Sequence, residues 1–185
     1  ITGNNNYFLK LWHEIDNRYL LINQTDINRV NKLDVKQKWL PYNKGGSYRK
    51  WFGNNEFVVD WKNNGEVLRS LRDDSGKMKA FPRSVNRYFT KGINFSAITS
   101  SDFSCRLMEK SIFGGGGNAV FSNEPLLTLG FLNSSLVGLM TKALNPTLNI
   151  LVGDILRLPY KNDFQNRAVI VSNVEALIEL AKSDW

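Results

Sequence analysis

The sequence PLLTLGFLNSSLVGLMTKAL, residues 125–144, carries the strongest secondary-structure signal in this chain of 185 residues. Proline at position 125 suits the first turn of a helix, and the leucines that follow at three- and four-residue spacing form one broad apolar face. Pro146 cannot continue a helix, so the helix should end near Leu144. The stretch therefore predicts a long amphipathic helix that packs on another layer of the fold.

The segments before this helix have the short, alternating or apolar patterns typical of strands. The expected strands are residues 57–61, 95–99, 104–108 and 119–121, with turns at 63–65 and 100–102 and a short helix and loop over 66–79. Together with the long helix, these segments predict an α+β fold with a mixed, largely antiparallel sheet.

Apolar residues at helical spacing also predict a short helix over residues 7–15 and a C-terminal helix from about 164 to 182. Residues 150–152 and 155–156 are interpreted as strands or extended core segments. The four consecutive glycines, 114–117, are expected to form a flexible or positive-φ connection between strands. We expect residues 1–163 to form the domain core and residues 164–185 to add the C-terminal helix.

Charge is distributed unevenly along the chain. The formal net charge is +7, and residues 32–91 hold 14 Lys and Arg against 6 Asp and Glu, a surplus of eight. A basic region in a globular domain indicates nucleic acid first and an anionic membrane second, whereas surplus lysine that only aids solubility is the plain alternative. No apolar run approaches the length of about 20 residues that spans a bilayer, so no membrane partner is expected.

Within the basic region, residues 38–55 (KWLPYNKGGSYRKWFGNN) interleave cations, aromatic rings, amides and paired glycines. Cations can neutralise phosphates, amides can hydrogen-bond base edges, and aromatic rings can stack on bases or brace a loop. The candidate phosphate contacts are Lys44, Arg49, Lys50 and, in a second segment, Arg83 and Arg87. The candidate base readers are Asn43, Ser47, Asn54 and Asn55, with Tyr48 and Trp51 bracing or stacking and Gly45 and Gly46 letting the backbone approach the duplex.

Several catalytic chemistries are excluded by the residues present. No Gly-Lys-Ser/Thr follows the glycine run, so it is not a phosphate-binding loop. The single histidine, His13, excludes a histidine-based triad, and the single cysteine, Cys105, excludes an internal disulfide and a multi-cysteine zinc site. The segment 145–148 (NPTL) lacks the second proline and the aromatic ring of an amino-methyltransferase motif. We therefore expect no catalytic, metal or cofactor site, and the single cysteine fits a reducing cytoplasm.

Several ordered motifs resemble the C-terminal half of adenine-specific DNA methyltransferases of BREX phage-defence systems, the PglX type. The resemblance covers most of the chain and extends more loosely to type IIG restriction-modification enzymes. The motifs are residues 2–5 with 8–14, residues 39–46 with 49–54, and residues 129–134, 144–149, 152–155, 158–159 and 181–185.

The resemblance implies a target recognition domain that binds double-stranded DNA, while a separate N-terminal domain of the parent protein binds S-adenosylmethionine and methylates adenine at N6. The start at Ile1 rather than Met fits a piece of such a protein. The expected partners are the duplex, the parent's own methyltransferase domain and other defence-system subunits. Residues 38–55 are so typical of the family that they could be structural, in which case residues 66–87 carry the specificity. A protein-interaction module and, third, a nuclease are the competing functions.

Overall fold

The computed structural model describes residues 5–22, 38–98, 102–161 and 163–185. The chain forms two compact units, each assembled from segments that are distant in sequence. The first unit contains residues 1–44, 55–90 and 109–115, and the second contains residues 45–54, 91–108 and 116–185. The basic stretch 38–55 is therefore divided between the units, with its central ten residues in the second.

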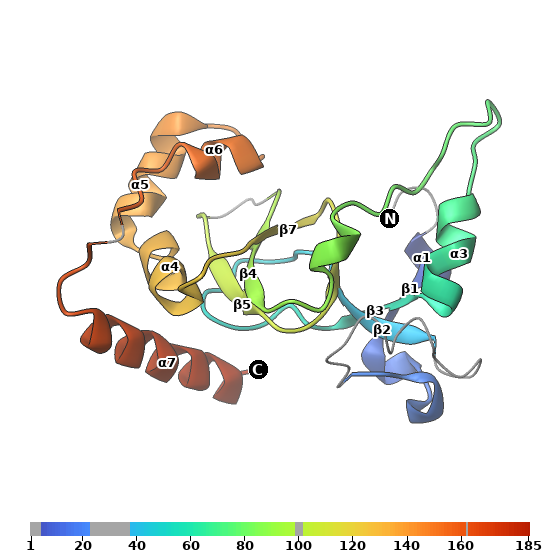
Figure 1. Ribbon diagram of the computed structural model, residues 1–185, viewed down its shortest axis with the longest axis horizontal. Coiled ribbons are helices and arrows are strands. Elements are labelled where there is room, and N and C mark those ends of the chain that lie inside the picture. Colours follow the sequence, from blue (N-terminus) through green and yellow to red (C-terminus); the bar gives the residue numbers. More distant parts are fainter. Residues whose placement is uncertain (1–4, 23–37, 99–101, 162) are drawn as a thin grey trace. The chain divides into compact units, whose positions relative to one another are not determined.

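The first unit is built on a four-stranded mixed sheet in the order β1-β3-β2-β6, as far as its described residues show (Figure 1). The strands are β1 (Leu9–Leu11), β2 (Trp39–Asn43), β3 (Phe57–Asp60) and β6 (Ile112–Phe113). Leu40 pairs with Val59 in the antiparallel β2–β3 ladder, and Tyr42 pairs with Ile112 in the parallel β2–β6 ladder.

The prediction of a helix over residues 7–15 is wrong. Only α1 (Asn5–Phe8) is helical before the chain enters β1, and 3-10 turns follow at Trp12–Glu14 and Asn17–Tyr19. Leu9 pairs with Val59 and is buried, so pairing with β3 prevails over the local helical pattern. The strand predicted over residues 57–61 is confirmed as β3.

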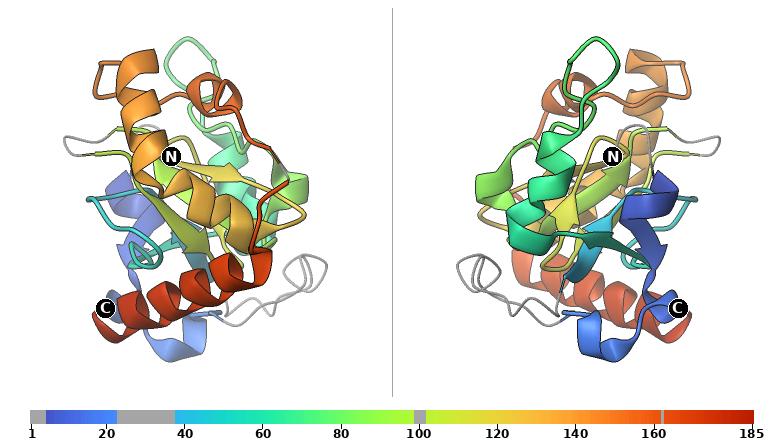
Figure 2. Two further views of the ribbon diagram at one scale, coloured as in Figure 1. Left: turned by 90° about the vertical axis from the view of Figure 1, so that its left-hand side faces the viewer. Right: turned by 90° about the vertical axis from the view of Figure 1, so that its right-hand side faces the viewer.

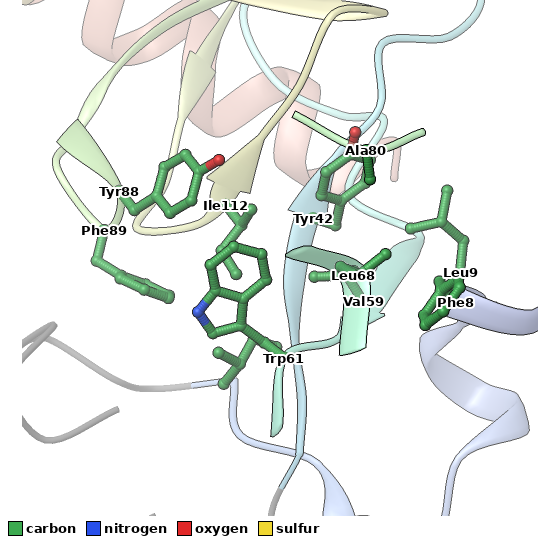
Figure 3. Packing of buried hydrophobic residues seen from close by; sticks show 11 residues of the cluster. Phe8, Leu9, Tyr42, Val59, Trp61, Leu68, Ala80, Tyr88, Phe89 and Ile112 are labelled. Carbon is green, nitrogen blue, oxygen red and sulfur yellow. The ribbon is translucent and has the colours of Figure 1, made fainter. Parts of the chain in front are cut away.

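The core of the first unit is rich in aromatic side chains (Figure 3). Trp61 makes an edge-to-face contact with Tyr88, with ring centroids 5.5 Å apart, and both side chains are buried. Burial raises the pKa of Tyr42 to about 12. In helix α3 (Lys62–Ser70), the three residues after Lys62, Asn63 to Gly65, have left-handed conformations, which confirms the predicted turn there and the short helix after it. A 3-10 turn at Val85–Arg87 closes the following loop.

The second unit contains an antiparallel sheet, three-stranded in the described residues, in the order β5-β4-β7. Its elements are β4 (Gly92–Ser96), β5 (Cys105–Met108), β7 (Gly117–Val120), α4 (Pro125–Leu132), α5 (Ser135–Leu144), α6 (Val152–Leu156) and α7 (Arg167–Ser183). Ile93 and Phe95 of β4 pack in one core with Leu129 of α4 and Val174 of α7. The α+β class and the C-terminal helix are thus confirmed, and α7 is a component of the second unit.

The long helix predicted over residues 125–144 is interrupted. Helix α4 ends at Leu132, and α5 starts at Ser135 after a bend of 65°. The break occurs where the Asn133 side chain leaves the helix to bond the backbone of Cys105, at 2.9 Å to both its nitrogen and its oxygen. The predicted start at Pro125 and end at Leu144 are confirmed.

Two smaller expectations differ from the structure in part. Residues 152–156 form helix α6 rather than a strand, because the Asp154 carboxylate accepts the Leu151 backbone N–H at 2.9 Å and stabilises the first turn. The glycines 114–117 do connect β6 to β7, but none of them has a positive φ. Gly114 is instead required by packing, since a Cβ there would lie 2.2 Å from the Tyr42 hydroxyl.

Candidate nucleic-acid interface

The central part of the basic stretch, residues 45–54, is an ordered loop held against the β5-β4-β7 sheet. The Ser96 hydroxyl accepts the Gly46 N–H at 3.0 Å and donates to the Gly46 carbonyl at 2.9 Å. Trp51 donates its N–H to the Cys105 carbonyl at 2.9 Å and accepts that of Leu107 at 2.8 Å, which extends the sheet beyond β5. The loop is therefore a fixed platform.

Left-handed backbone conformations give the loop its shape. Gly45, Trp51 and Asn54 have φ values of 86°, 72° and 59°. A Cβ on Gly45 would lie 2.2 Å from the Gly116 carbonyl oxygen. The close approach that this glycine permits is thus to the protein's own backbone, whereas the sequence interpretation assigned it to an approach to DNA.

The amides predicted to read bases have different environments. Asn54 is 1% exposed and donates its side-chain N–H to the Ser47 carbonyl at 2.9 Å. Asn43 is 3% exposed on β2. In this conformation neither side chain is open to a ligand, while Ser47 is exposed and Asn55 is half-buried.

Arg49 and Lys50 are half-buried and occupied within the second unit. The Arg49 guanidinium lies 4.6 Å from the ring centroid of Trp185, and the Lys50 ammonium donates to the Asn133 carbonyl at 2.9 Å. In the opposite direction, a cation of α7 contacts a ring of the loop, since the ammonium of Lys182 lies 5.5 Å from the ring centroid of Phe52. These reciprocal cation–π contacts join the loop to the end of α7 and contribute about 0.5–1 kcal/mol each at exposed sites.

The remaining candidates lie at the surface. Lys44 is exposed, with its ammonium 4.3 Å from the ring centroid of Phe57, and Tyr48 of the loop is 44% exposed. Arg83 and Arg87 are exposed on either side of Ser84, whose left-handed conformation starts the 3-10 turn. By unit, the first holds Asn43, Lys44, Asn55, Arg83 and Arg87, and the second holds the candidates from Gly45 to Asn54.

A buried polar network beneath the loop was missed in the sequence. Arg106 of β5 is 1% exposed and donates to Asn94 at 2.6 Å and to the hydroxyl of Ser96 at 3.2 Å. Because Ser96 also bonds Gly46, the network positions the loop from below. Arginine in a short strand normally indicates a solvent-facing position, so the pattern contained no signal for a buried cation.

Other kinds of site find little support in the described part of the chain. An open cavity of about 460 Å³ beside the loop is lined by Trp51, Leu177, Leu180, Ala181, Ser183 and Asp184, with a carboxylate and no cation to receive a phosphate. No three His, Cys, Asp or Glu side chains among the described residues gather to hold a metal ion. No single described helix is long and apolar enough to cross a bilayer. Helices α4 and α5 taken together would be long and apolar enough, by length and composition only, but they are bent by 65°.

No protein-family model matches the chain. Among curated proteins, the adenine-specific methyltransferase PglX of Lacticaseibacillus casei (strain Zhang) is 33% identical over 189 residues. The adenine-specific methyltransferase BrxX of Escherichia coli O9:H4 (strain HS) is 33% identical over 193 residues. The chain is homologous to PglX and BrxX. Both alignments cover the whole chain but only 15% and 14% of these relatives, so the chain spans about a seventh of their length.

The homology confirms the PglX-type resemblance, and the structure gives its motifs physical roles. In the motif at residues 129–134, Leu129 is in the core, Gly130 lies where a Cβ would be 3.0 Å from Val174, and Asn133 bonds β5. In the next motif, Asn145 donates to the Asn149 carbonyl at 2.7 Å and to the Asp154 carboxylate at 2.8 Å. These motif residues therefore hold the fold together.

Proposed function

We propose that the chain is a DNA-binding target recognition domain of an adenine-specific (N6) DNA methyltransferase in a phage-defence or restriction-modification system. The observation that carries the proposal is the concentration of positive charge in residues 32–91, in a chain homologous to adenine-specific methyltransferases. Lysine and arginine at such density suit the phosphates of a duplex, where each neutralised phosphate releases counterions.

Side-chain exposure suggests which of the predicted contacts could reach DNA and which support the loop. Lys44, Arg83 and Arg87 are the proposed phosphate contacts, and Ser47, Tyr48 and Asn55 lie where a base or sugar could be met. Most of the remaining candidates serve the loop's conformation or its attachment: Arg49, Lys50, Trp51, Gly45, Gly46 and Asn54. Asn43 is buried on β2. S-adenosylmethionine and the methyl-transfer residues belong, in this proposal, to another part of the methyltransferase polypeptide.

Titration of a fluorescent mixed-sequence duplex by anisotropy tests the proposal, with a highly acidic protein as competitor. Binding to the duplex that the acidic protein displaces only weakly supports DNA recognition. Equal displacement by the acidic protein would point to a general affinity for acidic surfaces. Incubation with labelled S-adenosylmethionine should transfer no methyl group to the duplex, and a purified chain that methylates DNA would contradict the division of roles.

A second candidate function is favoured by an apolar surface on the second unit. Helices α5 and α6 contact each other, and the segments that form and flank them expose Leu136, Leu139, Leu148, Leu151, Val152 and Leu156. Large exposed apolar surfaces mark protein interfaces. Because the relatives carry most of their length outside the aligned region, the proposed occupant is the methyltransferase part of the same polypeptide.

Mixing the chain with the methyltransferase part of its own parent polypeptide tests this interface by size-exclusion chromatography. The double variant Leu139→Asp/Leu156→Asp should lose the complex, whereas Leu180→Asp, on an exposed position of α7, should retain it. Absence of a complex, or equal binding by both variants, would remove this function.

A further inference from the structure

Residues 71–79 of the first unit form a two-stranded antiparallel ribbon that extends beyond α3 and turns back (Figures 1 and 2). Lys79 donates its N–H to the Leu71 carbonyl at 3.0 Å, Asp73 donates to the Lys77 carbonyl at 2.9 Å, and Arg72 pairs with Met78 between them. These hydrogen bonds within the segment hold the two sides of the ribbon together.

The tip of the ribbon is preorganised and open. One oxygen of the Asp73 carboxylate accepts the Ser75 N–H at 3.0 Å, the Ser75 hydroxyl at 2.6 Å and the Lys77 N–H at 2.9 Å. Gly76 completes the turn with a φ of 81°, and no atom lies within 4 Å of the position its Cβ would take. Asp74 and Ser75 are exposed at the tip.

The base of the ribbon is fixed to the core of the first unit. Leu71 is half-buried against the aromatic cluster, and Ala80, directly after the ribbon, is 5% exposed within it. A stiff tip on an anchored base makes the ribbon an arm whose position is set before any ligand binds, so little ordering entropy is lost on binding.

Charge on the arm favours a polyanion. Arg72, Lys77 and Lys79 are exposed, and within the described residues none of them forms an ion pair with a carboxylate. Alternation along a strand places Lys77 and Lys79 on the same face of the ribbon. Asp73 is engaged in the turn, which leaves Asp74 as the tip's exposed, uncommitted carboxylate.

We infer that this arm enters the major groove of duplex DNA, with Lys77 and Lys79 on the phosphates and Asp74 and Ser75 facing base edges. The major groove, about 12 Å wide, admits a two-stranded ribbon in an undeformed duplex, whereas the minor groove, about 6 Å wide, receives one only where the duplex is bent and the groove opened. A carboxylate is repelled by phosphates but accepts a hydrogen bond from the amino group of cytosine, so Asp74 favours sites with that donor. The inference rests on the proposed DNA-binding function and adds the element that reads the duplex.

Crosslinking from the tip tests the inference directly. Cys105 is fully buried and burial raises the pKa of its thiol, so a maleimide benzophenone should label Ser75→Cys selectively. On a mixed-sequence duplex, the labelled tip should crosslink strongly, and Lys161→Cys, exposed in the second unit, should crosslink weakly. The major-groove ligand methyl green should suppress the crosslink, and the minor-groove ligand netropsin should leave it.

A charge variant supplies the second measurement. Lys77→Ala/Lys79→Ala should make the negative slope of log affinity against log salt shallower, by about 0.9 for each phosphate that the arm no longer neutralises. The matched double variant Arg157→Ala/Lys161→Ala, two exposed cations outside both the arm and the basic region 32–91, should keep the slope. A wild-type chain that does not bind duplex DNA would end both the proposed function and this inference. Three outcomes would overturn the role of the arm while leaving DNA binding intact. They are a tip that does not crosslink, a crosslink that netropsin removes, and an unchanged slope in Lys77→Ala/Lys79→Ala.

Discussion

At the scale of single residues, Gly45 and Gly76 illustrate two reasons why a position requires glycine, namely a left-handed backbone and a close contact with another part of the main chain. Both have left-handed backbones, with φ of 86° and 81°, but a Cβ on Gly45 would meet the Gly116 carbonyl at 2.2 Å while one on Gly76 would meet nothing within 4 Å. Gly115 has neither feature. The three positions therefore form a natural series for measuring backbone conformation and backbone contact separately.

Gly76→Ala should lower the free energy of unfolding by about 1–2 kcal/mol, the cost of a left-handed L-residue. Gly45→Ala should lower it by at least about 1 kcal/mol more, because the new methyl group collides with a main-chain carbonyl that cannot move freely. Gly115→Ala, in open space, is the control and should be close to neutral. Urea unfolding followed by tryptophan fluorescence gives the three values, and equal losses for Gly45→Ala and Gly76→Ala would contradict the packing role of Gly45.

Asn133→Ala should lower the free energy of unfolding by about 1–3 kcal/mol, because the buried Cys105 N–H loses its side-chain acceptor, while the Cys105 carbonyl keeps the Trp51 N–H. Asn123→Ala, at an exposed asparagine of the same unit, is the matched control and should change it little. The measurement is again urea unfolding. A small effect of Asn133→Ala would mean that the bend between α4 and α5 does not depend on this amide.

At the scale of elements, the sequence predicts the ends of the 125–144 helical segment but not its interruption. Pro125 at its start and Pro146 just beyond its end are local signals, whereas the break depends on Asn133 reaching a strand 28 residues earlier in the chain. The same kind of long-range pairing turns residues 9–11 into β1. Local patterns therefore predict the C-terminal helix and β3, and they fail where a distant strand provides the partner.

Ser134 caps α5 by accepting the Val137 N–H at 3.3 Å. Ser134→Ala should therefore lower the free energy of unfolding by about 1 kcal/mol, the usual value of such a cap. The neighbouring Ser135→Ala is the control, since Ser135 is exposed in the first turn and does not occupy the capping position. Thermal unfolding by circular dichroism compares them, and an equal shift for both serines would argue against the cap.

Acid should weaken the segment that contains α6. Hydrogen bonds from Asn145 and from the Leu151 backbone lower the pKa of Asp154 below its ordinary value of 3.8. A carboxyl whose folded-state pKa is lowered contributes stability above the ordinary value, and that stability is lost as the pH falls through 3.8 and below. Asp154→Asn should therefore show a smaller loss of unfolding free energy on acidification than the wild type, and Asp163→Asn, an exposed control, should follow the wild type.

At the scale of the whole molecule, sequence reasoning located the basic region and the family but not the contact residues. Exposure cannot be read from residue type where polar groups serve the fold, as with Asn54 beneath its own loop and Arg49 over Trp185. The contacting residues of the basic loop and the end of α7 are at least 130 residues apart in sequence and meet only in the folded second unit. The proposed function therefore rests on charge density, while the exposure that separates proposed contacts from supporting residues required the structure.

The salt dependence of duplex binding tests the central claim most directly. Affinity for a mixed-sequence duplex, measured by anisotropy over a range of salt concentrations, should fall steeply, with a log–log slope of about −0.9 for each phosphate neutralised. Lys44→Ala/Arg83→Ala should make the slope shallower by up to about 1.8, the value for two phosphates. Absence of duplex binding, or an affinity that does not change with salt, would contradict the account.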